Sequence, residues 1–512
     1  MNIKASVFDL FAGPGGLGEG FSSFSNASNR QPFKIEMSVE KESSAHKTLE
    51  LRAFFRQFKG NLPDDYYKYL KGQGKLDRDK LFKAYPKQSS AAFEETLGGP
   101  RALGVKQDDA FIYDKLQTFA KKPGPKIVIG GPPCQAYSLV GRARNKGIKG
   151  YRAEKDNRHF LYEEYLRVLW VLKPEIFVME NVKGILSAKI KDQPVFPTIL
   201  KDLTHPGKAL KKRGGKEYKI YSLAHDNQSE LFTNSNYILR AEDYGIPQAR
   251  HRVILLGIRI DIDVEPSPLK RTKTHRTTHS VLADITPIRS GLSKSTDTPE
   301  NWHKIVKQVI KQVTKPPGPL KLKIASQREI IDRSSKLKSR GERFNRTTIK
   351  FKGDKTIADW YLDKKLKGFV NHESRGHIAD DLARYFFCAL FSQQNDGASP
   401  RAKDFPASLA PKHANWNSGK FVDRFKVQSS NKPSSTITSH ISKDGHYFIH
   451  PDPSQCRSLT VREAARLQTF PDNYYFEGTR TQQYVQVGNA VPPLLAYQIA
   501  SIVYDVLKRS KS

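Results

Sequence analysis

Cysteine is scarce in this 512-residue chain, which contains only three. Three cysteines cannot build a disulfide framework, so we expect a reducing, intracellular compartment. The sequence also lacks any apolar run near the roughly 20 residues that a membrane span requires. Its N-terminus lacks the long apolar stretch of a signal peptide. These absences predict a protein that is neither secreted nor inserted in a membrane.

Acidic residues are also few, with 52 Asp and Glu against 86 Lys and Arg, which gives a net charge of +34. Such an excess of positive charge predicts a polyanionic partner. Hydrophobic residues make up 38% and aromatic residues 10% of the chain, enough for a real core, so global disorder is excluded. The length predicts two or more folding units.

The positive charge is concentrated in residues 266–370, which hold 25 basic and 9 acidic residues, a net charge of +16. A solvated linker is one interpretation, and the proline-rich stretch 316–319 favours it. Against it, apolar residues recur at helical spacing between the lysines, and aromatic residues follow. We therefore favour a folded basic module that tracks phosphates.

Short apolar runs alternate with amphipathic segments over the first 260 residues, which predicts a mostly parallel sheet with helices. The predicted strands cover 6–11, 35–40, 127–130, 176–179 and 253–258, and one predicted helix covers 161–173. Residues 53–104 interrupt this rhythm as a helical insertion. In such folds ligands bind at the carboxyl ends of the strands, where Gly13, Glu40, Gly131 and Glu180 fall.

The first strand runs into a glycine-rich turn, residues 12–18. Glycines let the backbone approach a ligand closely, and the following helix N-terminus favours an anionic group. A nicotinamide oxidoreductase on the same fold is a further alternative, but it would leave the Pro-Pro-Cys-Gln sequence at 132–135 without a role. Glu40, after the second strand, suits two ribose hydroxyls, although a helix N-terminal acid is an equal alternative.

A rigid double proline precedes Cys134 in the sequence Gly-Pro-Pro-Cys-Gln, which follows the 127–130 strand. A cysteine at a strand end can be a nucleophile if nearby cations favour its thiolate. Arg250 and Arg252, before the last predicted strand, are candidate cations, or else part of an ordinary exposed edge. We interpret Cys388 and Cys456 as small buried residues.

Six motifs, in order, resemble those of the cytosine-5 DNA methyltransferases. They are Phe-Asp-Leu-Phe-Ala-Gly-Pro-Gly-Gly at 8–16, Gly-Pro-Pro-Cys-Gln-Ala-Tyr-Ser at 131–138, Glu-Asn-Val at 180–182, Gln-Ala-Arg-His-Arg at 248–252, Arg-Glu-Ala-Ala-Arg-Leu-Gln-Thr-Phe-Pro at 462–471 and Gly-Asn-Ala-Val-Pro at 488–492. The resemblance covers residues 1–265 and 430–512. The stretch 266–430 lies where that family keeps its variable target-recognition region.

The resemblance implies an α/β fold: a Rossmann-like class I sheet of S-adenosylmethionine-dependent methyltransferases with a second, smaller mixed target-recognition domain. We expect the catalytic domain over 1–290, including the insertion. The recognition domain is expected over 291–479. A C-terminal segment, 480–512, is expected to return to the catalytic domain.

The resemblance also implies the chemistry of a methyl transfer to C5 of cytosine. Cys134 would attack C6, and Glu180 would hydrogen-bond and protonate N3. Arg252 would hold O2, while Arg250 would support the thiolate and the acid. The base must leave the duplex to reach such a pocket. A basic, glycine-containing loop at 138–156 would help to expel it.

S-adenosyl-L-methionine is the implied methyl donor, and no metal is expected. In this chain its expected contacts are Phe11, Gly13, Gly15, Leu17, Glu40, Asp109, Pro133, Leu161, Asn489, Ala490 and Val491. Phe11 would lie against the adenine and Glu40 would bind the ribose. Asp109 would meet the adenine amino group. One departure from the family pattern is Lys41, where an aromatic residue is common.

We therefore expect a DNA cytosine-5 methyltransferase of a prokaryotic restriction-modification or phage-defence system, with double-stranded DNA as its substrate. It would be a cytoplasmic monomer acting at the nucleoid, with a cognate endonuclease or defence components as further partners. A tRNA cytosine-5 methyltransferase is the first alternative, and the long basic region argues against it. The second is an inactive DNA-binding regulator, which the intact Cys134, Glu180, Arg250 and Arg252 disfavour.

Overall fold

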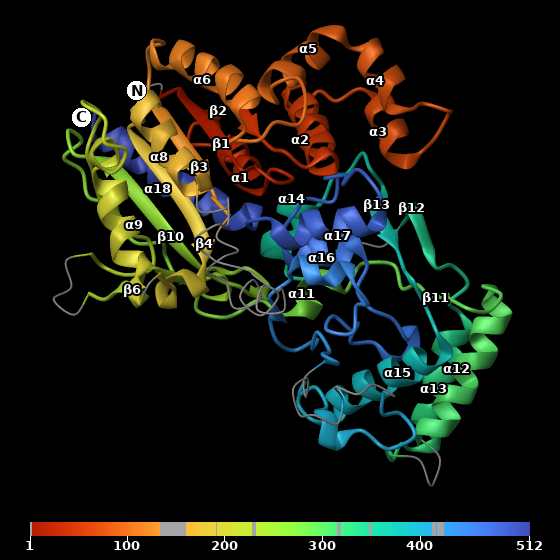
Figure 1. Cartoon of the computed structure of the whole chain (residues 1–512). Coiled ribbons are helices and arrows are strands. Elements are labelled where there is room, and N and C mark those ends of the chain that lie inside the picture. The colour runs from red at the N-terminus through yellow and green to blue at the C-terminus, as the bar shows by residue number, and fades with distance from the viewer. Residues whose placement is uncertain are drawn as a thin grey trace.

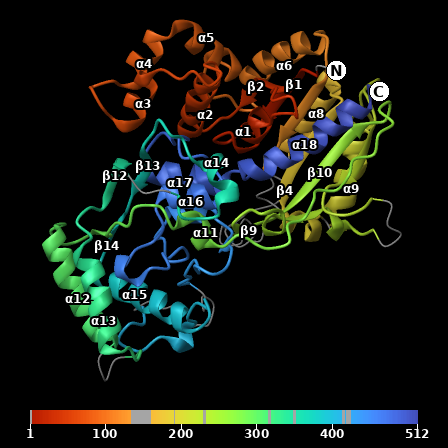
Figure 2. The ribbon, with the colours of Figure 1, turned by 180° about the vertical axis from the view of Figure 1, so that it is seen from behind.

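The computed structural model describes residues 3–133, 160–190, 192–227, 232–314, 319–347, 351–411, 416 and 424–511. Cys134 and the basic loop 138–156 lie outside the described residues. Figure 1 shows a large sheet with its helices on one side of the molecule and a group of shorter strands and helices on the other. Helices α16 (Val461–Leu467) and α17 (Arg480–Asn489) lie between these two parts, as the reverse view in Figure 2 also shows.

The large sheet has the strand order β2-β1-β3-β4-β10-β7, with β8 paired to β10. Its strands are β1 (Ala5–Leu10), β2 (Phe33–Val39), β3 (Lys126–Gly130), β4 (Ile176–Val182), β7 (Tyr218–Ser222), β8 (Ile238–Arg240) and β10 (His251–Arg259). The four strands from β2 to β4 are parallel, as the alternation predicted. The sheet is nevertheless mixed, because β10 runs antiparallel to β4, β7 and β8.

Helices cover both faces of this sheet because successive strand residues point to opposite sides. Val7 packs with α1 (Gly16–Ser23) and α18 (Pro493–Arg509) on one face. Phe8, its neighbour, packs with α6 (Lys106–Ala120), α8 (Phe160–Leu172) and α9 (Val195–Thr204) on the other. The short helix α10 (Pro206–Ala209) follows α9.

The C-terminal stretch Arg480–Arg509 is long and apolar enough, by length and composition, to cross a membrane. The sequence was expected to contain no such stretch. More than half of its most apolar window, 56%, is buried inside the protein. Its helix α18 contributes Leu495, Ile499 and Val503 to the core beneath the sheet, so its apolar character is explained by packing.

The insertion consists of helices, as predicted. After α2 (Ser43–Arg56) come α3 (Asp64–Lys71), α4 (Arg78–Ala84) and α5 (Pro86–Glu95). Tyr66, Tyr69, Leu70 and Leu81 of these helices are buried in one apolar cluster with Phe54 of α2.

The basic region is folded over its described residues, which contradicts the linker alternative there. It contains α11 (Thr278–Leu282), β11 (Gly291–Leu292), α12 (Pro299–Thr314), α13 (Ile324–Ser335), β12 (Gly341–Arg346), α14 (Ala358–Tyr361) and the start of β13 (Gly368–Glu373), and it is followed by β14 (Gly376–His377) and α15 (Ala379–Gln394). Trp302, Val306 and Ile310 of α12 are fully buried against α15, which is why the lysines of α12 lie on its outer side. The remaining short strands are β5 (Lys189–Ile190), β6 (Gln193–Pro194), β9 (Gln248–Ala249) and β15 (Ser434–Ser435).

Candidate active site

Glu180 lies near the carboxyl end of β4, directly beside the loop that follows β3. A Cβ atom added to Gly131 would be 2.9 Å from Glu180 Oε2. Any side chain at this position would make the carboxylate of Glu180 shift. The close contact places the acid beside Gly131, which lies three residues before Cys134 in the chain.

Arg252 forms an ion pair with Glu180, with Nε 2.9 Å from Oε1. Both side chains are largely buried, with 16% and 14% of their surface exposed. The pair forms because β10 is antiparallel to β4, so that Arg252 near the start of one strand faces Val182 at the end of the other. The acid and one of the two predicted cations thus meet at the carboxyl edge of the sheet.

Asn181 is hydrogen-bonded to the loop that precedes Cys134, a contact that was not predicted from the sequence. Its Nδ2 donates to the carbonyl oxygen of Pro132 at 3.3 Å, and its Oδ1 accepts the backbone N–H of Val182 at 2.8 Å. Because Pro133 and Cys134 follow directly, this bond positions the start of the predicted nucleophile loop against β4. The only signal in the sequence is that Asn181 directly follows the acid.

Arg250, the second predicted cation, is buried. Its Nη1 donates to the carbonyl oxygen of Ile437 at 2.8 Å and, more weakly, to that of Gly488 at 3.4 Å. Burial, with a smaller contribution from Arg252, lowers the pKa of Arg250 well below its usual value, whereas Glu180 partly opposes the shift. A buried cation held mainly by carbonyl oxygens favours an additional anion nearby.

Two buried glutamines join the predicted motifs to one another. Gln248 accepts the backbone N–H of Ile437 at 2.8 Å and donates to the side chain of Gln468 at 3.1 Å. Gln468 in turn donates to the carbonyl oxygen of Val487 at 2.8 Å. Nothing in the sequence indicated a role for either glutamine. The partners of Gln248 lie about 190 to 220 residues away in the chain, and only folding brings them together.

The glycine-rich turn after β1 is tied to the acid that follows β2. Gly13 donates its backbone N–H to Glu40 Oε2 at 2.8 Å, and Glu42 donates its own to Glu40 Oε1 at 2.7 Å. Burial raises the pKa of Glu40. Gly13 has φ +57°, and an added Cβ would meet no atom of the described structure within 4 Å. The turn therefore borders open space where a Cβ atom of Gly13 would lie.

The C-terminal motif closes the other side of this turn. A Cβ atom at Gly16 would be 2.2 Å from the carbonyl oxygen of Val491, so the two segments touch through their backbones. Ala490 and Val491 are buried, whereas Asn489 is exposed. Leu17 packs its side chain into the core, so its backbone is the part that remains for a ligand. Phe11 is half-buried beside the core of the opposite face.

Asp109 and Leu161 both approach Gly104. Asp109 Oδ1 accepts the backbone N–H of Gly104 at 2.9 Å, and Leu161 Cδ2 would lie 3.3 Å from a Cβ atom there. The backbone of Arg101 donates to the carbonyl oxygen of Glu40 at 2.9 Å, which brings this segment beside β2. Asp109 and Leu161, two of the predicted cofactor contacts, are thus near each other. Lys41, which follows Glu40 where the family often has an aromatic residue, is exposed to solvent.

The other two cysteines are buried, as predicted. Burial raises the pKa of the Cys388 thiol well above its usual value and also raises that of Cys456. Neither thiol is suited to form a nucleophilic thiolate. Within the described ranges, no group of three or more His, Cys, Asp or Glu residues is arranged to hold a metal ion.

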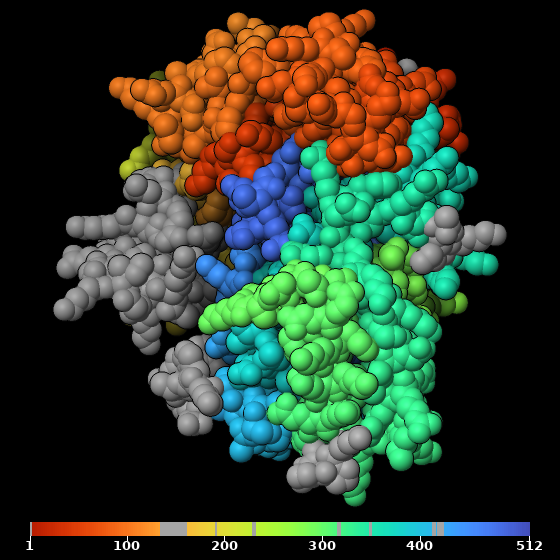
Figure 3. Space-filling view, turned by 90° about the vertical axis from the view of Figure 1, so that its right-hand side faces the viewer, coloured from red at the N-terminus to blue at the C-terminus, as the bar shows by residue number. Residues whose placement is uncertain are grey.

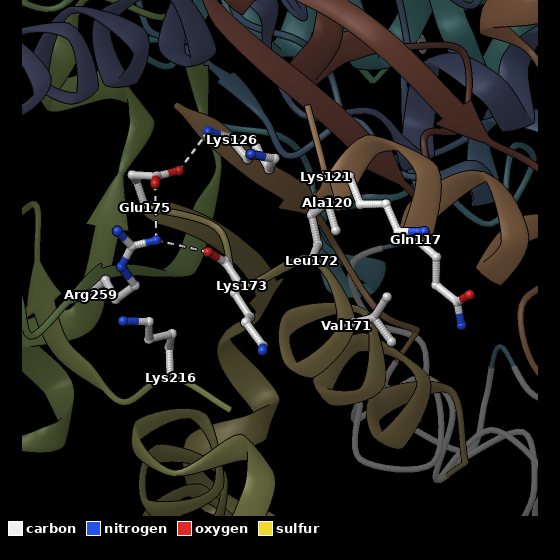
Figure 4. A pocket seen from close by; sticks show the side chains of 10 residues that line it. All are labelled: Gln117, Ala120, Lys121, Lys126, Val171, Leu172, Lys173, Glu175, Lys216 and Arg259. Carbon is white, nitrogen blue, oxygen red and sulfur yellow. Dashed lines mark hydrogen bonds and ion pairs between the residues drawn. The ribbon is translucent and has the colours of Figure 1, made fainter. Parts of the chain in front are cut away.

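A separate hollow lies at the opposite edge of the sheet. Figure 4 shows its side chains, among them Lys126 at the start of β3, Glu175 just before β4 and Arg259 at the end of β10. Arg259 Nη1 lies 2.9 Å from Glu175 Oε1, and Glu175 Oε2 accepts the backbone N–H of Lys126. Since Gly131 and Glu180 follow the other ends of these strands, this hollow is not part of the site.

Comparisons with known proteins cover most of the chain. The family model for the C-5 cytosine-specific DNA methylase matches residues 104–504. Type II methyltransferase M.Bpa9945I of Bacillus paralicheniformis is 34% identical and covers 98% of this chain and 99% of that protein. Type II methyltransferase M.DdeI of Desulfomicrobium norvegicum is 28% identical over 73% of this chain and 71% of its own. A solved structure from E. coli, described as a prophage-encoded DNA modification methyltransferase, is 18% identical with a TM-score of 0.47 and covers 99% of this chain and 100% of its own.

Proposed function

Because this chain belongs to the C-5 cytosine-specific DNA methylase family, we propose that it methylates C5 of a cytosine within a specific duplex DNA sequence, with S-adenosyl-L-methionine as donor. Its activity class is that of a DNA cytosine-5 methyltransferase. The observation that carries the proposal is the Glu180–Arg252 pair, held against Gly131 at the entrance to Cys134.

The residues around the glycine-rich turn fit the methyl donor. Glu40 is only partly buried and its carboxylate is held by the Gly13 and Glu42 N–H groups, a suitable position for two ribose hydroxyls. The N-terminus of α1 favours a carboxylate such as that of methionine. Phe11, Gly15, Leu17, Pro133 and the segment 489–491 would complete the site, with Asp109 and Leu161 toward the adenine. When bound, the donor supplies an activated methyl group.

Each side chain of the site then has a chemical task on the cytosine. Cys134, as a thiolate, attacks C6, and Glu180 donates a hydrogen bond and a proton at N3, so that negative charge does not build up on the ring. The electron-rich C5 accepts the methyl group. Loss of the C5 proton to water then re-forms the C5–C6 double bond and expels the cysteine as a thiolate, and the N3 proton returns to Glu180. Arg252 binds O2 and keeps the carboxyl of Glu180 in place, and the buried cation of Arg250 favours the thiolate.

The cytosine must leave the helix to reach this buried edge of the sheet. Extruding a base costs a few kcal/mol, which phosphate contacts on either side offset. The basic loop 138–156 and the basic region 266–370 are the parts of the chain that we assign to these contacts. We also propose that the recognition domain covers residues 291–479, between the catalytic domain and the C-terminal segment.

We further propose that the protein is the modification enzyme of a type II restriction-modification or phage-defence system, as the names of its relatives suggest. A cognate endonuclease would be its genetic partner, and the enzyme would act as a cytoplasmic monomer on the nucleoid. Bisulfite sequencing of DNA from cells that express the chain would identify the methylated sequence.

The central test is the variant Cys134→Ala. We expect it to transfer no labelled methyl group while it still binds duplex DNA. In wild-type enzyme, 5-fluorocytosine in the target should trap a covalent complex through Cys134, because fluorine cannot leave as a proton. Full activity of Cys134→Ala, or a trapped complex through Cys388, would overturn the mechanism.

A further inference from the structure

The helical insertion contacts the basic region directly, through the C-terminal end of α3. Arg343 of β12 donates from Nη2 to the carbonyl oxygen of Tyr69 at 2.7 Å and from Nε to that of Leu70 at 3.2 Å. The last carbonyls of a helix lack partners within the helix and carry partial negative charge. Arg343 therefore caps α3 with both hydrogen bonds and a full positive charge.

Two aromatic rings, which also contact each other, lie against the same guanidinium. Arg343 Cζ lies 4.9 Å from the ring centroid of Tyr69 and 4.6 Å from that of Tyr475. Tyr475 belongs to the segment after α16, so three parts of the chain meet at this one side chain. Each cation–π contact adds to the hydrogen bonds rather than replacing them.

A second attachment lies at Asp363, in the turn between α14 and β13. Asp363 Oδ2 accepts the hydroxyl of Tyr67 at 2.9 Å and Nδ2 of Asn473 at 2.8 Å. Leu366 and Val370 are buried in the same apolar cluster as the helices of the insertion. In Figures 1 and 2, α3 lies beside β12 and β13, and Figure 3 shows the surface of the insertion lying against the surface of this region.

The segment 473–475 connects this contact to the glycine-rich turn. Asn473 accepts a hydrogen bond from Arg52 Nη1 at 3.0 Å, and the hydroxyl of Tyr474 donates to the carbonyl oxygen of Pro14. The strands β12 and β13 are thus attached through α3 and through 473–475 to the part of the protein that holds Glu40.

We infer that helix α3 is a brace that fixes β12 and β13 relative to the catalytic half, and that Arg343 and Tyr67 are positioning residues for DNA engagement. The inference rests on the proposed function, because it takes these strands to belong to the DNA-recognition region. Within the described structure the contacts of Arg343 are with Tyr69, Leu70 and Tyr475, none of which is a predicted site residue, so its loss acts on the placement of DNA rather than on the chemistry.

The test is steady-state methyl transfer by the full chain carrying Arg343→Ala. Arg343 is exposed, so its truncation leaves no buried cavity. We expect the KM for duplex DNA to rise at least about fivefold, a size typical of coupling between sites. The KM for S-adenosylmethionine and kcat at saturating DNA should stay within about twofold, a change too small to signal lost coupling. Arg343→Lys, which keeps the charge but has fewer donors, should restore part of the KM, and Tyr67→Phe should raise it less than Arg343→Ala.

Amide hydrogen exchange gives a readout that needs no activity. In Arg343→Ala, peptides covering 341–347 and 368–373 should exchange faster, while those covering β1 should not change. The matched control is Lys68→Gln, which removes one positive charge from the outer side of the same helix.

An unchanged KM for DNA with unchanged exchange in Arg343→Ala would overturn the brace. An equal rise in KM for Lys68→Gln would also overturn it, because bulk charge would then be the cause. If the wild-type chain transfers no methyl group to duplex DNA, the proposed function fails instead, and the exchange experiment still decides on the brace.

Discussion

Glu180 and Gly131 are so close that a single methyl group would push them apart. A Cβ atom at residue 131 would be 2.9 Å from Glu180 Oε2, well inside van der Waals contact. The other oxygen of the carboxylate is paired with Arg252 at 2.9 Å, so a shift of Glu180 would disturb this ion pair. The position of the acid therefore depends on an absent side chain.

We predict that Gly131→Ala lowers kcat by about tenfold or more, because small misplacements of a catalytic group carry such a cost. DNA binding should be retained. Single-turnover methyl transfer measures the effect. In a double-mutant cycle with Glu180→Gln, the two effects should be strongly non-additive, since both act on the same carboxyl group. Simple additivity would show that residue 131 acts on something other than the acid.

At the scale of single residues, the sequence predicted the acid, the cations and the glycines, because their types carry recognisable chemistry. It did not predict Asn181, Gln248 or Tyr474. Amide and hydroxyl groups are useful only through their partners, and these partners are loop carbonyls such as those of Pro132 and Pro14. Such partners are known only once the chain is folded.

At the scale of elements, the direction of β10 decides whether the site exists. Alternating strands and helices predicted a mostly parallel sheet, and a parallel β10 would place Arg252 at the opposite edge from Glu180. Because β10 is antiparallel to β4, its first residues lie at the edge where β4 ends.

A buried ion-pair network joins α11, α16 and the segment after α16. Arg466 is fully buried, with Nη1 2.6 Å from Asp284 and Nη2 2.7 Å from Asp472. We predict that Arg466→Met lowers the free energy of unfolding by about 3–5 kcal/mol, because it leaves two buried carboxylates without their cation. Thermal unfolding measures this as a lower Tm.

The control for this prediction is Asp505→Ala, which breaks an exposed pair with Arg509 on α18. Exposed pairs contribute only about 0–1 kcal/mol, so the Tm should hardly change. Equal losses in the two variants would contradict the special role of the network.

At the scale of the whole molecule, stability depends on pH through buried histidines. Burial lowers the pKa of His450 to about 4 from 6.5, and its other charged neighbours are Arg457, which lowers it further, and Glu463 and Asp452, which raise it. The folded state therefore binds fewer protons than the unfolded state between these values. This contribution is fully present above pH 6.5 and is lost as the pH falls toward 4.

Asp9 acts in the opposite sense, because burial raises its pKa to about 7 and its contribution is lost as the pH rises through that value. The test is therefore a difference between variants. Between pH 7 and pH 5, His450→Asn should lose about 2 kcal/mol less stability than the wild type, from the linkage of its pKa to folding. Chemical unfolding at both pH values measures this. The same substitution at the exposed His440 should leave the difference unchanged, and a flat result for His450→Asn would refute the assignment.

The sequence by itself determined the activity class, the residue types of the site and a polyanionic substrate, because charge, motif order and strand alternation are local properties of the chain. Only the tertiary structure decided that β10 is antiparallel and that Asn181 holds the Pro132 loop. It also decided that the insertion meets the basic region through Arg343 and Tyr67. These features depend on contacts between residues up to 296 positions apart, and the pairing of such distant segments is set by the packing of the whole fold.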